Sequence, residues 1–235
     1  MTQFKRLFVW AGGAMFVTSL AACAYFYLVI WASPAAAGRS PMMAAAIDTA
    51  LFAVFALHHS LFARESVKTT IARVVPERLL RSFYVWIASV LLLAVLALWQ
   101  PVAGTVYDVT GSPAFVHAAV QLFGIWLIAR SVAQISPLEL AGIRHAPVNS
   151  ISHVSQALQV GGPYKWVRHP LYLGWVLALF GAAHMTADRA AFATISTAYL
   201  LVAIPWEERS LLRVFGEPYA RYQRAVRWRV VPYVY

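Results

Sequence analysis

The chain has 235 residues, of which 61% are hydrophobic and 12% are charged, and its mean hydropathy is +0.64. A soluble domain is closer to half apolar and a quarter charged, so this composition excludes an ordinary soluble enzyme and predicts a polytopic membrane protein. The net charge is +10, but the basic residues lie in short loops between apolar runs, which indicates membrane topology and no nucleic-acid partner. A single Cys excludes an intrachain disulfide and makes a cysteine metal cluster implausible.

Six apolar runs predict membrane spans, because a spanning helix needs about 20 mostly apolar residues. They cover residues 7–31, 42–63, 82–100, 114–135, 170–185 and 189–206, the fifth being short and the sixth being capped by Asp188. Of the 19 Lys and Arg residues, 17 lie in the two termini and in alternate loops. By the positive-inside rule both termini are then expected in the cytoplasm.

The predicted fold class is therefore all-α, a polytopic membrane bundle of about six helices with a cytoplasmic helical tail. We expect one integral-membrane domain, 1–235, with a four-helix part over 1–135 and a second part over 136–235. The spacing of apolar residues in 64–81 predicts an interfacial amphipathic helix that Pro76 stops. The long non-spanning segment 136–162 is interpreted as a lid.

The stretch from Gly161 to Gly174 combines basic, aromatic and helix-starting residues. Pro170 suits the first position of a helix, because its missing N–H would have no partner there, and His169 then lies near the N-cap. The free N–H groups and dipole of that helix end, together with Lys165 and Arg168, favour an anion. The alternative interpretation is a basic anchor at the lipid headgroups.

An acid pair, Glu207 and Glu208, follows the sixth apolar run. At the end of a helix the dipole disfavours acids, so the pair is interpreted as serving a ligand. The tail after it predicts two short helices, the first ended by Gly216 and the second begun by Pro218. Aromatic side chains near both clusters could face a cationic centre such as a sulfonium; they are Tyr164, Trp166, Tyr172 and Trp206.

Two motifs in these segments resemble the C-terminal half of the isoprenylcysteine carboxyl methyltransferase superfamily. They are Gly-Pro-Tyr-x-x-x-Arg-His-Pro-x-Tyr-x-Gly at 162–174 and Glu-Glu-x-x-Leu-x-x-x-Phe-Gly-x-x-Tyr-x-x-Tyr at 207–222. The resemblance implies S-adenosylmethionine as the methyl donor and S-adenosylhomocysteine as the product. Residue by residue, it implies a donor site of Gly162, Pro163, Tyr164, Val167, Arg168, His169, Tyr172, Leu173, Gly174, Glu207, Glu208, Tyr219 and Tyr222.

The N-terminal half looks like bacterial methanethiol S-methyltransferases, through His58-His59-Ser60-Leu61-Phe62-Ala63-Arg64 and Arg73-Val74-Val75-Pro76. This resemblance implies that a small thiol is methylated to a thioether. A thiol reacts as its thiolate, so His58 and His59 are candidate bases, and Arg168 is a third candidate catalytic residue. The expected partners are a small-molecule or lipid-soluble methyl acceptor and membrane lipids.

Two other functions stay open at this point. The C-terminal half alone is compatible with a lipid-type acceptor, either an isoprenylcysteine carboxylate or a phospholipid amine. His117 and His184 are expected at the same end of two spans, where paired histidines could hold a haem in a non-enzymatic protein. A lone histidine in a span more often hydrogen-bonds a neighbour, and no metal is expected at the proposed site.

Overall fold

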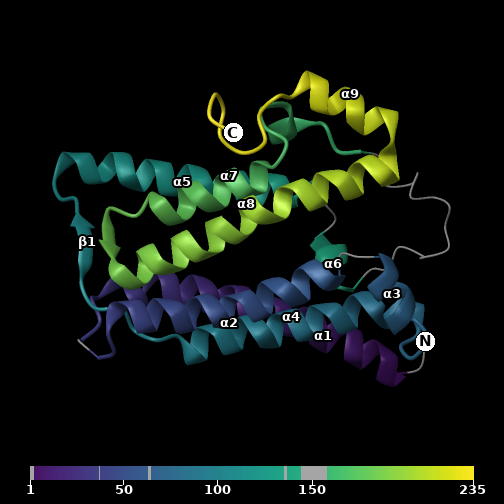
Figure 1. Ribbon diagram of the computed structural model, residues 1–235, viewed down its shortest axis with the longest axis horizontal. Coiled ribbons are helices and arrows are strands. Elements are labelled where there is room, and N and C mark those ends of the chain that lie inside the picture. Colours follow the sequence, from purple (N-terminus) through teal and green to yellow (C-terminus); the bar gives the residue numbers. More distant parts are fainter. Residues whose placement is uncertain (1–2, 37, 63–64, 135–136, 144–157) are drawn as a thin grey trace. The chain divides into compact units, whose positions relative to one another are not determined.

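The computed structural model describes residues 3–36, 38–62, 65–134, 137–143 and 158–235. Helices dominate, so the all-α expectation is confirmed, and β1 and β2 add a two-stranded sheet (Figure 1). In chain order the elements are α1 (Gln3–Leu28), η1 (Ile30–Ala32), α2 (Pro41–Phe62), α3 (Glu65–Ile71), α4 (Glu77–Leu98), β1 (Thr105–Asp108), α5 (Ser112–Val132), α6 (Pro137–Leu140), η3 (Gly162–Lys165), α7 (Pro170–Phe180), β2 (His184–Thr186), α8 (Ala187–Phe215) and α9 (Glu217–Ala225).

Five helices in the described part of the chain are long and apolar enough to cross a membrane. They are α1 continued by η1, α2, most of α4, α5 and α8. The fifth predicted span, 170–185, is represented by α7, which has 11 residues. It is shorter than predicted because residues 184–186 form β2 and pair with β1.

The amphipathic helix that was predicted to end at Pro76 is present as α3, but it ends earlier. Helix α3 ends at Ile71, and α4 begins at Glu77, directly after Pro76. Proline has no N–H to donate and fixes its own φ, so it starts a helix more readily than it continues one. The helix of the third span therefore begins at Glu77, five residues before the predicted start of that span.

Asp188 does not cap the sixth helix as predicted, because it already lies in the first turn of α8. Its carboxylate Oδ1 instead accepts hydrogen bonds from Trp99 Nε1 and from the backbone N–H of Val102, both at 2.9 Å. The hydroxyl of Thr186 accepts from the backbone N–H of Arg189 at 3.3 Å, so Thr186 supplies the cap.

Helix α8 continues through Pro205 to Phe215, so the sixth span and the first predicted tail helix form one helix of 29 residues. Gly216, with a φ of +59°, ends it, and α9 follows as predicted. Glu207 and Glu208 consequently lie within a helix and not at its end. The interpretation that they oppose a helix dipole is wrong, and their role must come from their contacts.

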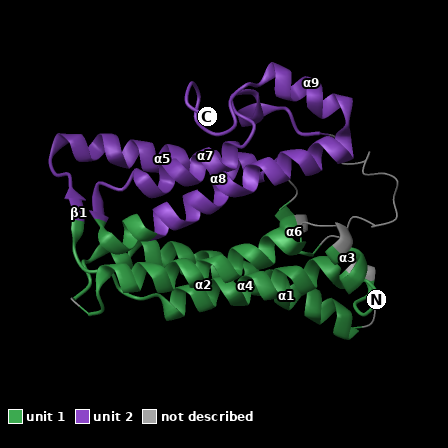
Figure 2. Cartoon of the chain, viewed as in Figure 1, with its two compact units in different colours: residues 1–105, 137–148, 186–191 green, residues 106–136, 149–185, 192–235 purple. Residues whose placement is uncertain are grey.

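The chain divides into two compact units (Figure 2): residues 1–105, 137–148 and 186–191 form unit 1, and residues 106–136, 149–185 and 192–235 form unit 2. In unit 1, α4 packs against α1 and α2. The rings of Trp31 and Trp99 lie 4.8 Å apart between centroids, and Trp86 Nε1 donates to the carbonyl of Phe8 at 3.1 Å. The predicted single domain, with parts 1–135 and 136–235, stays a prediction.

Three connecting segments of unit 1 meet at one end of its helices. Ala35 and Ala103 form a parallel β-bridge, and the backbone N–H of Ala187 donates to the carbonyl of Gly104 at 2.9 Å. These residues come from the first, third and fifth loops, which the distribution of Lys and Arg assigns to the same side of the membrane. The backbone contacts are consistent with that assignment.

In unit 2, α5 and α7 pack closely through glycines. A Cβ at Gly124 would lie 2.4 Å from the backbone nitrogen of Ala178, and a Cβ at Gly174 would lie 2.8 Å from the carbonyl oxygen of Gly124. The side chain of Gln121 also donates to the carbonyl of Ala178 at 2.9 Å. Small residues allow helices in membranes to approach to such distances, and the contact fixes the helix whose N-terminus carries Arg168 and His169.

Candidate functional site

The N-terminus of α7 brings the two predicted clusters of unit 2 together. Pro170 is the first residue of α7 and His169 is its N-cap, as predicted. One turn later, Tyr172 points its hydroxyl at Glu207 from α8, with Oη to Oε2 at 2.8 Å. Residues from positions 168–172 and 207–208, nearly 40 positions apart, therefore form one polar cluster.

Glu208 is the centre of that cluster. Its side chain is 6% exposed, and burying a carboxylate is costly unless it is paired and hydrogen-bonded. Oε1 accepts from Arg168 Nε at 2.6 Å and lies 3.3 Å from His169 Nε2. Oε2 accepts from Arg168 Nη2 at 3.4 Å, from Gln223 Nε2 at 3.4 Å and from Arg229 Nε at 3.3 Å. Two cations and a histidine thus compensate the buried charge.

His169 bridges the two acids. Its Nδ1 lies 3.5 Å from Glu207 Oε2, while its Nε2 faces Glu208. The imidazole is stacked on Tyr172, with centroids 5.2 Å apart and planes 9° apart. The Glu207 side chain is 42% exposed, so within this cluster it presents a carboxylate to the outside that the protein orients through Tyr172 and His169.

Arg168 is committed to the protein through its whole guanidinium. Besides its two bonds to Glu208, Nη1 donates to the carbonyls of Val226 and Arg227 at 2.8 and 2.9 Å. The backbone N–H groups of Arg168 and His169 donate to the carbonyls of Trp228 and Arg229 at 2.9 and 2.8 Å. The segment after α9 therefore completes the cluster.

Three tyrosines border the cluster: Tyr164 in η3, and Tyr219 and Tyr222, which lie buried on α9. The hydroxyl of Tyr222 donates to the carbonyl of Tyr164 at 2.8 Å, which joins α9 to η3. Burial and the Glu207 charge raise the pKa of Tyr164 to about 12. Burial also raises the pKa of Tyr219 and of Tyr222, so the three rings are neutral phenols at neutral pH.

The remaining predicted donor-site residues have packing contacts or special backbone conformations. Pro163 and Val167 are buried, and Leu173 is half-buried. Gly174 makes the helix contact with α5 described above. Gly162 has a φ of +53°, and a Cβ there would lie 2.1 Å from Gln134 Nε2. Close packing explains the glycine at 174 and the positive φ explains the glycine at 162, and the predicted role of all five residues toward a ligand stays a prediction.

His58 and His59 lie on α2 in unit 1, beside Tyr84 of α4. His59 Nδ1 is hydrogen-bonded to the hydroxyl of Tyr84, while the ring of His58 stacks on the Tyr84 ring with centroids 5.4 Å apart. Phe62 covers His58 at 4.8 Å. Both ring nitrogens of His58 are buried and have no hydrogen-bond partner among the described residues, which is a costly arrangement for a protein interior.

His117 and His184, the pair considered for a haem, lie on α5 and β2. His184 Nδ1 is 3.0 Å from Asp108 Oδ1, and the ring of His117 lies 5.8 Å from the ring of Tyr107. His184 thus pairs with a neighbour, as the simpler interpretation expected, whereas the contact shown for His117 is between rings. The segment interpreted as a lid, 136–162, lies largely outside the described residues.

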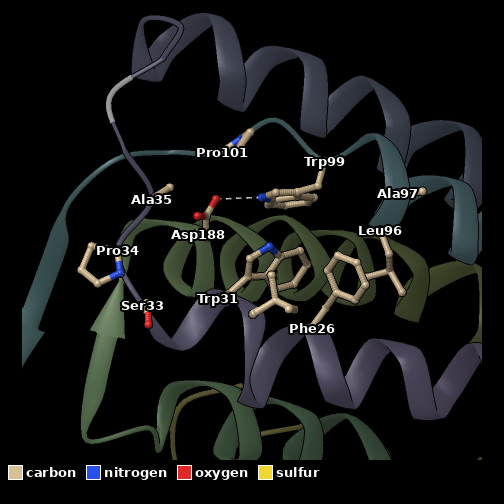
Figure 3. Close-up of a pocket in the computed structure, with 11 residues that line it drawn as sticks. Phe26, Trp31, Ser33, Pro34, Ala35, Leu96, Ala97, Trp99, Pro101 and Asp188 are labelled. Atoms are coloured by element: carbon tan, nitrogen blue, oxygen red, sulfur yellow. Dashed lines mark hydrogen bonds between the residues drawn. The ribbon is translucent and has the colours of Figure 1, made fainter.

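A cavity of about 390 Å³ opens at the loop end of unit 1 (Figure 3). Its apolar wall consists of Phe26, Trp31, Leu96 and Trp99. Asp188 contributes a carboxylate, which already accepts a hydrogen bond from the indole N–H of Trp99. Residues predicted for the donor site or as the base do not line it. Its walls are the packed aromatic ends of α1 and α4.

Sequence reasoning missed Gln223 and Arg229. Neither follows a recognisable spacing, and Arg229 is one of six basic residues in the tail. One signal pointed to such a residue: if Glu208 is buried, a cation must reach it, because acids are rarely buried without a partner. The sequence alone does not say which acid is buried or which cation answers it.

Comparison with known proteins identifies the family. Residues 142–218 match the family model described as phospholipid methyltransferase. Methanethiol S-methyltransferase 2 of Bradyrhizobium diazoefficiens is 37% identical, over 77% of this chain and 70% of that protein. The methanethiol S-methyltransferase of Mycobacterium tuberculosis is 37% identical, over 78% and 76%, and that of Pseudomonas deceptionensis is 34% identical, over 80% and 73%. The chain belongs to the methanethiol S-methyltransferase family.

Membership in the methanethiol S-methyltransferase family makes the chain a membrane methyltransferase. The suspected resemblance is thereby confirmed for most of the chain. The matched region of the phospholipid methyltransferase model contains the polar cluster of α7 and α8 but ends before Gln223 and Arg229. No solved structure matches the chain, so the geometry of the cluster comes from this structure.

Proposed function

We propose that the protein transfers a methyl group from S-adenosylmethionine to a small thiol such as methanethiol and releases a thioether. The similarity to methanethiol S-methyltransferases over about four fifths of the chain supports this acceptor. The cluster around Glu207 and Glu208 supports a polar methyl donor. A bound sulfonium supplies an activated methyl group, so the protein's task is binding, orientation and exclusion of water.

The donor site is proposed to lie at the N-terminus of α7. Its chemistry suits a molecule with an ammonium, ribose hydroxyls and a sulfonium. Glu207 is an oriented and half-exposed carboxylate that can accept from an ammonium or a diol. The neutral rings of Tyr164 and Tyr172 can face a cationic centre, and His169 and Arg168 hold the acids in position.

The acceptor needs a group that removes its proton. We propose that a neutral imidazole of His58 or His59 takes the proton from the thiol. The thiolate sulfur then gains the methyl carbon, the bond from that carbon to the sulfonium sulfur breaks, and the proton leaves on the histidine. The buried ring nitrogens of His58 support its candidacy, because they lack a partner among the described residues.

For the location we propose a bacterial inner membrane with both termini and the donor cluster on the cytoplasmic side. The distribution of 17 of 19 basic residues over alternate segments supports this orientation. A cytoplasmic donor cluster would have access to S-adenosylmethionine made in the cell.

A lipid-type acceptor is the second candidate, since residues 142–218 match a phospholipid methyltransferase model. The experiment that separates the two feeds labelled S-adenosylmethionine to the purified protein with methanethiol, phospholipids or a prenylated cysteine peptide. We expect dimethyl sulfide by headspace gas chromatography from methanethiol. Label in a lipid or peptide without any thioether would contradict the proposed acceptor.

The histidines are tested with the same assay. His58→Gln and His59→Gln keep a polar side chain but remove a base, so the variant of the acting histidine should lose most of its thioether production. Retention of full activity in both variants would show that neither histidine is the base, without affecting the identity of the acceptor.

A further inference from the structure

The segment after α9 contains Arg229, whose guanidinium binds the buried carboxylate of Glu208 in the donor cluster. Arg229 Nε donates to Glu208 Oε2 at 3.3 Å, and Glu208 already receives both Nε and Nη2 of Arg168 on its two oxygens. Two guanidinium groups thus share one buried carboxylate. Hydrogen bonds between guanidinium and carboxylate groups are geometrically specific, so Arg229 restricts where the Glu208 carboxylate can lie.

The backbone of the same residue holds the other side of the cluster. The carbonyl of Arg229 accepts from the N–H of His169 at 2.8 Å, and the carbonyl of Trp228 accepts from the N–H of Arg168 at 2.9 Å. Arg229 therefore touches His169 through its carbonyl and touches the carboxylate partner of His169 through its side chain. It closes a ring of contacts from the tail to α7, then to α8 and back to the tail.

Arg229 is itself fixed by the residues that follow it. Nη1 donates to the hydroxyl of Tyr235 at 3.0 Å, and the guanidinium lies 5.1 Å from the centre of the Tyr235 ring. The backbone N–H of Arg229 donates to the carbonyl of Tyr235 at 2.9 Å. Because both the side chain and the backbone of Arg229 are held, its guanidinium binds Glu208 from a fixed position and so restrains the carboxylate.

We propose that Arg229 is a positioning residue for the methyl donor. It holds Glu208, and through Glu208 the imidazole of His169, in the arrangement that orients the exposed carboxylate of Glu207. The inference rests on the proposed donor site. The side chain of Arg229 acts through Glu208 and His169 and needs no contact of its own with the donor.

The test compares Arg229→Gln with Arg221→Gln, an exposed charge on α9, in purified full-length protein. The dissociation constant for S-adenosylhomocysteine is measured by calorimetry, and the KM values for donor and acceptor are measured separately. Arg229→Gln should weaken donor affinity by about tenfold or more, which is the typical effect of losing a bond to a charged group. The donor KM should rise in parallel, while the acceptor KM and the affinity of Arg221→Gln stay unchanged.

Arg229→Lys should restore part of the affinity, because lysine keeps the charge but lacks the fork that reaches both Glu208 and Tyr235. Wild-type affinity in folded Arg229→Gln would overturn the inference, and so would an equal rise in both KM values. If Arg229→Gln does not fold, Arg229→Lys and Tyr235→Phe decide, since wild-type affinity in both would overturn it. If the wild type fails to bind S-adenosylhomocysteine, the proposed donor site is wrong, which is a different result.

Discussion

Glu207 and Glu208 are adjacent on α8, yet the side chain of Glu207 is 42% exposed and that of Glu208 is 6% exposed. Glu207 is held by a tyrosine and faces a histidine, whereas Glu208 is shared by two arginines, a histidine and a glutamine. The two acids were equivalent candidates in the sequence. We therefore propose that Glu207 binds the donor and that Glu208 supports the structure, and the two roles can be measured separately.

Glu207→Gln should weaken binding of the methyl donor and leave the fold intact. The change removes the charge of a half-exposed carboxylate and keeps its shape. Losing a hydrogen bond to a charged group costs about 1.5–3 kcal/mol, or roughly ten- to a hundredfold in affinity. Calorimetry with S-adenosylhomocysteine measures the loss, and an affinity equal to that of the wild type would remove Glu207 from the donor site.

Glu208→Gln should reduce stability, because two arginines would then share a partner without charge. Removing one member of a buried ion pair typically costs about 3–5 kcal/mol. Glu217→Gln is the matched control, since Glu217 pairs with Arg224 at the surface, where both side chains are 65% exposed, and such pairs contribute about 0–1 kcal/mol. Thermal unfolding in detergent should separate the two variants, and equal melting temperatures would contradict the central role of Glu208.

Gly124→Val should separate α5 from α7 and lower thermal stability. The new side chain would begin 2.4 Å from the backbone nitrogen of Ala178, and overpacking a well-packed contact typically costs about 1–3 kcal/mol. Because Arg168 and His169 directly precede Pro170, the first residue of α7, donor affinity should fall as well. Gly38→Ala is the control, since a Cβ at that position would have no atom of the described residues within 4 Å, apart from its neighbours in the chain. A Gly124→Val protein as stable as the control would show that the helices can move apart at little cost.

The ionisation of Tyr164 predicts a pH dependence of stability. Burial, and to a lesser extent the Glu207 charge, raises its pKa from 10.0 to about 12. A raised folded-state pKa contributes stability below the unfolded pKa, and that contribution is lost as the pH rises from 10 toward 12. Unfolding measured across this range should show a shallower decline in Tyr164→Phe. The same decline in both proteins would assign it to other groups.

Reporter fusions test the proposed orientation. Fusions after residues 36, 108 and 187 should report the non-cytoplasmic side, because the loops at these positions carry few Lys and Arg residues, whereas the alternate segments carry most of them. A fusion after Tyr235 should report the cytoplasm. A cytoplasmic signal from residue 108 would contradict the orientation and with it the cytoplasmic donor cluster.

Much of the fold could be predicted from the sequence, because apolar run length and Pro and Gly positions act locally. Pro170 and Gly216 mark helix ends correctly for that reason. The β1–β2 pair and the continuation of α8 through Pro205 could not be predicted in this way. Strand pairing depends on a distant partner, and a proline inside a helix is decided by the surrounding packing rather than by its own preference.

The meeting of the two motifs could be predicted from the sequence, but the contacts of each side chain could not. The motifs predict that Arg168 and His169 lie near the acid pair, and the structure confirms that these side chains are in contact. The different contacts of Glu207 and Glu208 depend on which carboxylate faces inward. The two residues are adjacent on one helix, so the sequence does not say which one this is. The contribution of Arg229 depends on how the tail folds back, and no local pattern encodes that.

The ring of contacts around Glu208 also constrains the order of events during biosynthesis. The ring joins Arg168 to Gln223 and Arg229, so it cannot close until the ribosome has released the last of these residues. The hydrophobic helices emerge earlier, and synthesis proceeds from the N-terminus. A chain interrupted before residue 223 would therefore keep Arg168 and Glu208 but lack both Gln223 and Arg229, and its polar cluster would stay incomplete.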